Sequence, residues 1–189
     1  MGKNTVISTK SKKYQIYNIN KYKLLDFTKD KINTKNSRSI IIIPNLCNTN
    51  YMYGGTHCNS IATYYPIVEQ SYNVLGKVFV NNNPGYVQFI DVLQNNDNKL
   101  IIANMLAQTG VTNQIKTRTI NYNYLVDSML KIKHMILQLQ KKYIDEHIDI
   151  SIHSYKFGAN KSANGNWNFI INLIEDIWLP HTNINIHEK

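Results

Sequence analysis

The chain has only two cysteines among its 189 residues, Cys47 and Cys58, and they do not form a CxxC motif. Two cysteines are too few for a disulfide scaffold or a cysteine-rich zinc site, so we expect a reduced, intracellular compartment. Long apolar runs are also missing. The strongest, residues 40–44, is strand-sized and far below the roughly 18 residues of a membrane span. Residues 1–13 lack the apolar stretch of a signal peptide, so we expect a cytoplasmic protein with no membrane partner.

Acidic residues are scarce as well: 12 stand against 21 lysines and arginines, a net charge of +9. Residues 1–38 hold ten basic and two acidic residues, whereas residues 39–189 hold eleven and ten. This basic N-terminal arm predicts either a solvated, lysine-rich surface or a contact with the phosphates of a nucleic acid. The many asparagines, isoleucines, lysines and tyrosines have AT-rich codons, which indicates a low-GC source such as a virus, phage or bacterium.

The apolar patterns predict strands interleaved with helices. Strands are expected over residues 14–19 (an edge strand), 39–44 (ended by Pro44), 77–80, 86–92, 100–106, 147–154 and 183–187. Helices are expected over residues 57–65, 121–140 and 167–178, the last with Phe169 facing inward, and residues 28–37 resemble a turn. The pattern predicts one α/β domain over residues 1–189, with the basic arm (1–38) and a core (39–189). We expect helices on both sides of a mixed sheet.

Two strand-to-helix junctions are polar and rich in small residues. They are residues 47–57 (CNTNYMYGGTH) and residues 156–167 (KFGANKSANGNW). In α/β folds, ligands usually bind at the carboxyl ends of the strands. Glycine lets the backbone approach a bulky anion, and the N–H groups at a helix start attract negative charge. The junctions therefore predict a diphosphate site, although loops of this composition also serve simply to cap helices.

Four sequence blocks carry a family resemblance: LCNTNYMYGG, SIATYYPIVEQSYNVLGKVFV, IIANMLAQTGV and YKFGANKSANGNWNFIINLIEDIW. In this order and spacing, over residues 40–187, they resemble the macro domain family. The branch they resemble most is the ADP-ribose 1″-phosphate phosphatases, with related phage, viral and bacterial proteins. The resemblance implies a three-layer α/β/α fold with a mixed central sheet. It also implies an ADP-ribose cleft at the ends of the central strands, without a metal or a cofactor.

The resemblance also implies roles for individual residues. Asn48 and Gln108 would be catalytic, orienting the distal ribose or a water during hydrolysis of its phosphomonoester. Asn18 would stand where the family keeps an adenine-binding aspartate, and Lys161 or Lys156 would neutralise phosphate charge. The implied ligand-binding residues are Asn18, Gly54, Gly55, Thr56, Phe157, Gly158, Ala159, Asn160, Lys161 and Ser162.

The sequence departs from the family pattern in both loops. Thr56 replaces a glycine of the first loop, and the second loop is one residue longer and poorer in glycine. Asn18 would accept a weaker hydrogen bond from the adenine amino group than a carboxylate would. These departures leave open a second function, a catalytically inactive scaffold or interaction protein in a virus or phage. Nucleic-acid binding through residues 1–38 is a third.

The histidines and Cys47 indicate structural roles more than catalytic ones. The six histidines form no zinc-binding pattern. His57 begins a predicted helix beside the first loop, and this position favours a structural role over that of a catalytic base. Cys47 has no histidine partner in the sequence, so buried packing is the expectation.

Overall fold

A computed structural model describes residues 5–9, 12–18, 24–33, 38–95, 98–112 and 117–188 of the protein. The strands are β1 (Thr5–Thr9), β2 (Lys12–Asn18), β3 (Ser39–Asn48), β4 (Val87–Asn95), β5 (Asn98–Gln108), β6 (Asp149–Ser154) and β7 (Asn183–Glu188). The helices are α1 (Leu24–Asn33), α2 (Thr56–Tyr64), α3 (Pro66–Leu75), α4 (Lys77–Asn82), α5 (Tyr122–Lys142) and α6 (Trp167–Ile177).

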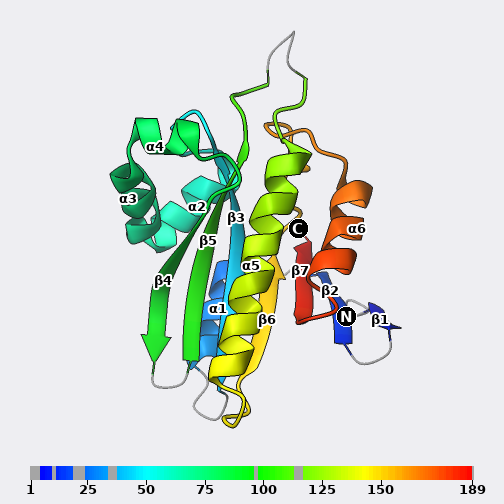
Figure 1. Ribbon diagram of the computed structural model, residues 1–189. Coiled ribbons are helices and arrows are strands. Elements are labelled where there is room, and N and C mark those ends of the chain that lie inside the picture. The colour runs from blue at the N-terminus through cyan, green and yellow to red at the C-terminus, as the bar shows by residue number, and fades with distance from the viewer. Residues whose placement is uncertain are drawn as a thin grey trace.

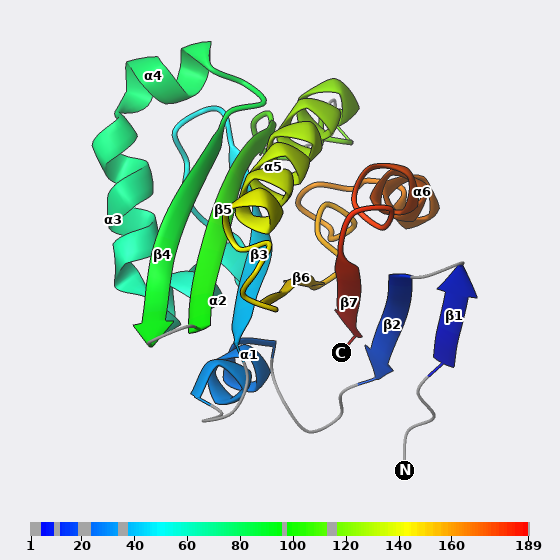
Figure 2. The same ribbon diagram turned by 60° about the horizontal axis from the view of Figure 1, so that its bottom comes forward.

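The described strands form one seven-stranded sheet in the order β1-β2-β7-β6-β3-β5-β4. Strands β2, β7, β6, β3 and β5 run parallel, and β1 and β4 add antiparallel edges. Helices α5 and α6 cover one face of the sheet, and α1, α2 and α3 cover the other (Figures 1 and 2). The predicted fold class, a three-layer α/β/α arrangement around a mixed sheet, is confirmed.

The central strand β3 is buried on both faces, as its continuous β-branched run predicts. Ile40 and Ile42 pack in the cluster beneath α5 and α6, whereas Ile41 and Ile43 pack against α1, α2 and α3. The prediction that Pro44 ends this strand is wrong. Pairing with β6 stops at Ile42, so Pro44 lies where β3 has a neighbour on one side only and its missing N–H is tolerated.

Two other sequence predictions fail because the segments are short. Residues 28–37 were expected to be a turn, but residues up to Asn33 belong to α1, whose buried stripe begins upstream at Leu24. Residues 77–80 were expected to be a strand, but they form α4, with Val80 buried and Val78 exposed. A run of four residues with alternate valines fits either period, so the pattern could not decide between them.

The N-terminal segment adds two strands to the sheet and α1 to one face. The expected edge strand at residues 14–19 corresponds to β2, but β1 pairs with its outer side, so β1 is the edge. Residue 19 and the side chains of residues 1–23 lie outside the described residues. The expectation of nucleic-acid binding through the basic arm depends on those side chains and stays a prediction.

The two long helices on the α5–α6 face follow the sequence prediction closely. Asn121 caps α5 by accepting hydrogen bonds from the N–H groups of Asn123 and Tyr124. Trp178, which directly follows α6, is fully buried. Its Nε1 donates to the Met129 carbonyl oxygen at 2.8 Å. The inward placement of Phe169 is wrong, because 44% of its surface is exposed. None of the described helices is long and apolar enough to cross a membrane.

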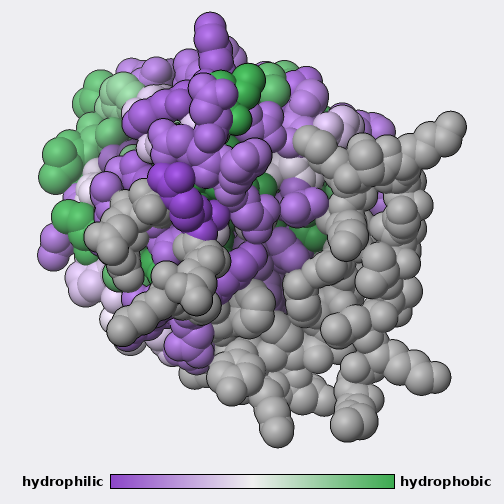
Figure 3. Space-filling view, turned by 90° about the horizontal axis from the view of Figure 1, so that it is seen from below, coloured by the Kyte–Doolittle hydropathy of each residue, from purple (hydrophilic) through white to green (hydrophobic). Residues whose placement is uncertain are grey.

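Because β3, β5, β6 and β7 are parallel, their carboxyl ends lie at one edge of the sheet, the upper edge in Figure 1. The loops after β3, β5 and β6 all gather there. Figure 3 shows the opposite end, where hydrophilic side chains predominate among the described residues. The fold therefore brings both predicted ligand loops to the same edge of the sheet.

Candidate functional site

The loops that follow β3 and β6 meet at the carboxyl edge of the sheet. A Cβ atom added to Gly55 would lie 4.0 Å from Ser162 Oγ. Gly55 ends the first predicted loop, and Ser162 lies in the second. The structure thus brings together two segments that are about a hundred residues apart in the sequence.

Asn48 is the last residue of β3, and its side chain is largely engaged by backbone atoms. Its Nδ2 donates to the Gly110 carbonyl oxygen at 2.7 Å, while its Oδ1 accepts from the N–H groups of Gly110 and Asn50. Tyr72 donates its hydroxyl proton to the Asn48 carbonyl oxygen at 2.7 Å. The buried amide of Asn48 therefore ties the loop after β3 to the loop after β5.

Gln108, at the end of β5, bridges the same region. Its Nε2 donates to the carbonyl oxygens of Gly110 and Ser162 at 3.3 and 3.4 Å. Thr119 also donates its hydroxyl proton to the Ser162 carbonyl oxygen, at 2.6 Å. The described parts of the segment after β5 therefore join the two ligand loops. Sequence reasoning missed this role because the bonds run mainly to backbone atoms, which no residue pattern marks.

Replacing Asn48 with alanine is expected to lower the free energy of unfolding by about 2–3 kcal/mol, since three hydrogen bonds of a buried amide are lost. Urea denaturation would measure the change. Asn50→Ala is the matched control, because that side chain is exposed and its backbone N–H is unaffected by the substitution. The control should stay within about 0.5 kcal/mol of the native protein. Equal losses in the two variants would contradict the bridging role.

The first loop is exposed where it enters α2. Gly55 has φ 96° and ψ 158°, a conformation open essentially only to glycine. Gly54 is also exposed, with a Cβ there 3.9 Å from Asn59 Oδ1, and Thr56 is the exposed first residue of α2. Because Gly55 has no side chain, it cannot cap the N–H groups that begin this helix. Those groups remain suited to an anion.

The second loop divides into a buried base and an exposed tip. Phe157 is buried against Trp167 and Trp178, with ring centroids 6.2 and 6.0 Å away. Gly158 is also buried and has φ +73°. These two residues, predicted to bind ligand, lie beneath the loop, where they set its shape.

The tip of the second loop is a tight turn. Asn160 Oδ1 accepts from Ser162 Oγ and from the Ala163 N–H, both at 2.9 Å. Asn160 and Lys161 are exposed, while Ala159 and Ser162 are half-buried. Thr112 donates its hydroxyl proton to the Lys161 carbonyl oxygen at 3.4 Å, which adds another link to the segment after β5.

Two predicted site residues, Asn18 and Lys156, lie outside the contacts between the two loops. The backbone of Asn18 ends β2 opposite Glu188, and its side chain lies outside the described residues. Strand β2 is three strands from β3, a separation of roughly 14 Å at the usual strand spacing. Lys156 Nζ lies 5.9 Å from the centroid of the Trp167 ring.

His57 and Cys47 take structural positions. The His57 ring packs edge-on against Tyr155 with centroids 5.0 Å apart. Cys47 is 1% exposed, as expected for a packing residue, and burial raises the pKa of its thiol well above the usual range. Within the described residues, no group of three or more histidines, cysteines or acidic residues is arranged to hold a metal.

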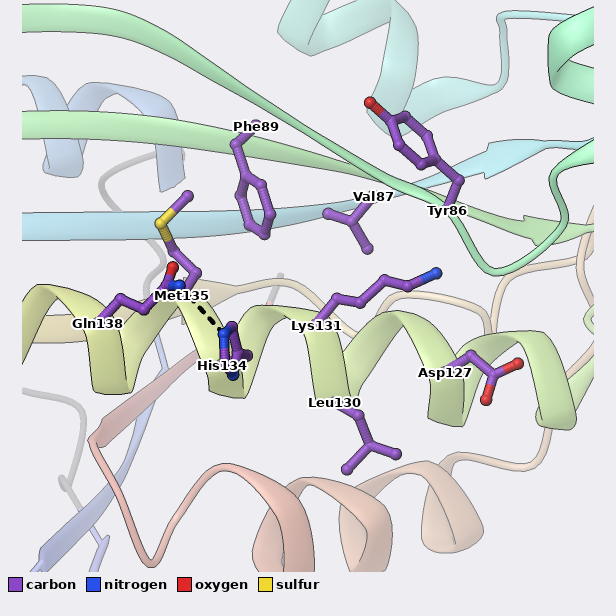
Figure 4. Close-up of a pocket in the computed structure, with 9 residues that line it drawn as sticks. All are labelled: Tyr86, Val87, Phe89, Asp127, Leu130, Lys131, His134, Met135 and Gln138. Atoms are coloured by element: carbon purple, nitrogen blue, oxygen red, sulfur yellow. Dashed lines mark hydrogen bonds between the residues drawn. The ribbon is translucent and has the colours of Figure 1, made fainter.

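A separate groove of about 640 Å³ lies between β4 and α5. Figure 4 shows Val87 and Phe89 extending from β4 towards Lys131 and Met135 of α5. Lys131 Nζ donates to the Gly85 carbonyl oxygen at 2.7 Å, so this charge is already engaged. None of the predicted site residues lines the groove. We therefore place the candidate site at the junction of the two loops.

Comparisons with solved structures identify the fold. No protein-family model matches the sequence, and no curated protein matches it. A protein of unknown function from Bacteroides thetaiotaomicron is similar with a TM-score of 0.72 and 16% identity, over 95% of this chain and 100% of that chain. A macrodomain protein from Streptomyces coelicolor gives a TM-score of 0.61 and 17% identity, over 84% and 94%.

A third similar structure is Thermosipho africanus DarTG, which was solved in complex with ADP-ribose. Its TM-score is 0.60 at 8% identity, and the match covers 97% of this chain and 43% of that longer chain. At identities this low, the structural similarity establishes the fold alone. The residues of the site must be judged from the structure of this chain. The chain has the macrodomain fold.

Proposed function

We propose that the protein binds ADP-ribose, or a derivative of it, where the loops after β3 and β6 meet. The observation that carries this proposal is the closeness of the two loops at the carboxyl edge of the sheet, where a Cβ atom added to Gly55 would lie 4.0 Å from Ser162 Oγ. The macrodomain fold supports the choice of ligand, since a structure of similar fold was solved with ADP-ribose. The four sequence blocks that resemble the macro domain family include both of these loops.

The diphosphate would lie against the start of α2. Its first N–H groups have no side-chain cap from Gly55, whereas Asn166 caps α6 by accepting from the Phe169 N–H at 3.3 Å. The uncapped helix therefore offers the stronger attraction for phosphate oxygens. The exposed Lys161 would add positive charge from the second loop.

Hydrolysis of a distal phosphomonoester is the finer part of the proposal. Donors around the loops would stabilise charge that develops on the phosphate oxygens. Asn48 and Gln108 act mainly by holding the loops in register, because their amides already bond to Gly110 and Ser162. Release of phosphate from ADP-ribose 1″-phosphate tests this step. Tight binding without phosphate release would identify a binding module instead.

Titration calorimetry with ADP-ribose, and with AMP as the control ligand, tests the binding proposal. We expect micromolar affinity for ADP-ribose and much weaker binding of AMP. Gly55→Ala should weaken ADP-ribose binding about tenfold, because strain of about 1–3 kcal/mol must shift the loop. Gly76→Ala is the matched control, since Gly76 also has a positive φ, +76°, but lies between α3 and α4, outside both loops, and a Cβ there would meet nothing within 4 Å. Absence of heat at millimolar ADP-ribose would refute the proposal and leave a macrodomain-fold scaffold.

A further inference from the structure

The two cysteines of the chain flank the first loop of the candidate site. Cys47 is the penultimate residue of β3, and Cys58 lies in the first turn of α2. Both thiols are free and nearly buried, with exposures of 1% and 5%. They share one hydrophobic cluster with Tyr72, Val80 and Leu106. The fold thus brings together the two ends of the segment that contains Asn48, Gly54 and Gly55.

Both thiols contact the same buried amide. Asn45 Nδ2 donates to Cys47 Sγ at 3.4 Å, and Cys58 Sγ donates to Asn45 Oδ1 at 3.3 Å. Cys58 Sγ also lies 3.4 Å from the carbonyl oxygen of Leu46, the residue that directly precedes Cys47. The Cys58 thiol is therefore held over the strand at the position of Cys47.

The two thiols differ in acidity. A hydrogen bond with the Cys47 thiol lowers the pKa of Cys58, and backbone groups of Gly54 and Cys58 act in the same direction against the effect of burial. The N-terminal turn of α2 also favours a thiolate there. Burial raises the pKa of Cys47. The position of Cys58 in the first turn of α2 and its larger exposure, 5% against 1% for Cys47, assign the attacking role to Cys58 and the resolving role to Cys47.

We propose that Cys47 and Cys58 form a dithiol that is sensitive to hydrogen peroxide and closes to an intrachain disulfide. The Cys58 thiolate attacks a peroxide oxygen, the O–O bond breaks, and the departing hydroxide takes a proton to give water and a Cys58 sulfenic acid. The Cys47 sulfur then attacks the Cys58 sulfur and gives up its proton. The S–S bond forms, the S–O bond breaks, and the hydroxyl group leaves with that proton as water. One peroxide is reduced to two waters while two thiols are oxidised.

Closure would link the end of β3 covalently to the first turn of α2. The intervening segment carries Gly55 and the N–H groups that begin the helix, so their positions would shift with the redox state. If the protein binds ADP-ribose as proposed above, the disulfide form would bind it with a different affinity. Only this consequence depends on the proposed function.

Mass spectrometry of the full chain after treatment with hydrogen peroxide tests the disulfide directly, since the sequence has no other cysteine. We expect monomers that lose both free thiols and the mass of two hydrogen atoms, and that recover on addition of dithiothreitol. Near-ultraviolet circular dichroism would verify that the protein stays folded. Native protein that keeps both thiols, or loses them only by forming dimers, would overturn the proposal.

Two single variants test the order of the steps. Cys47→Ser should stop at a Cys58 sulfenic acid, which dimedone traps. Cys58→Ser should leave Cys47 unmodified at the same peroxide concentration. Equal oxidation of the two variants would refute the assigned roles.

The link to the ligand is measured separately, by titrating reduced and oxidised protein with ADP-ribose. Equal affinities would refute the coupling between the dithiol and the loop. If the reduced protein fails to bind ADP-ribose, the proposed function fails while the disulfide, which is scored by mass alone, stands.

Discussion

Alanine at position 158 is expected to destabilise the protein by about 3–4 kcal/mol, the sum of backbone strain and overpacking of the core. Gly158 has φ +73°, and a Cβ there would lie 2.5 Å from Ile120 Cδ1 and 3.2 Å from Ile170 Cδ1. Both isoleucines are buried, so neither can move away without disturbing its neighbours. Chemical denaturation of Gly158→Ala would measure the loss.

The steric part of this cost can be isolated with a control elsewhere in the chain. Gly76 has nearly the same φ, +76°, but a Cβ there would meet nothing within 4 Å. Gly76→Ala should therefore cost only the strain of its backbone conformation, φ 76° and ψ 154°, about 1–3 kcal/mol. The difference between the two variants reports the close packing at Gly158. Equal losses would show that the second loop has room to adjust.

The same packing explains how the second loop is shaped. The Gly165 N–H donates to the Gly158 carbonyl oxygen at 2.7 Å, and a Cβ on Gly165 would lie 2.6 Å from that oxygen. The two glycines close the base of the loop and leave Asn160 and Lys161 at its exposed tip. Gly158 thus shapes the second loop through the path of the backbone, while the side chains at the tip are exposed.

The elements that the sequence predicts well are those whose pattern extends over many residues. Helix α5 presents an apolar stripe through Leu125, Met129, Ile132 and Ile136, which no strand period fits. In α4, by contrast, the six residues contain one buried side chain, Val80. Gly76, with φ +76° and ψ 154°, separates α4 from α3, and backbone conformation of this kind is not visible in an apolar pattern.

The candidate site was predictable only in part, for a similar reason. Glycine and asparagine in the loops after β3 and β6 mark the two segments that meet. The bonds that hold them together run from Asn48 and Gln108 to the backbone of Gly110 and Ser162. Any residue type supplies such backbone partners, so the fold alone identifies them.

A buried pair of histidines gives the second large prediction, which concerns pH. His153 Nδ1 lies 3.0 Å from His187 Nε2, and both residues are 1% exposed. Asn185 Nδ2 contacts His153 Nε2 at 3.1 Å and also donates to the Ile152 carbonyl oxygen. Since an amide nitrogen only donates, His153 Nε2 is an acceptor and Nδ1 carries the proton that it donates to His187. The pair is complete only when both rings are neutral.

Protonation of either ring is disfavoured in the folded protein. Burial, then the neighbouring charges of His187 and Lys31, lower the pKa of His153 well below its usual value. Burial, followed by the charge of Lys31, lowers the pKa of His187 to about 4. Lys31 is itself paired with Asp149, at 3.5 Å. The unfolded chain binds protons at these histidines near pH 6.5, so it binds more protons than the folded chain between about pH 4 and 6.5.

Unfolding therefore takes up protons in this window, and the free energy of unfolding falls as the pH falls from 7 towards 4. Between pH 7 and pH 5 the two histidines together should cost about 3–4 kcal/mol. Urea denaturation at the two pH values would measure this loss.

His187→Gln keeps an acceptor for His153 Nδ1 but does not titrate, so it should reduce the loss by about half. Equal stability of the native protein at both pH values would contradict this prediction, because it would mean that the two rings take up protons at the same pH in the folded protein as in the unfolded chain.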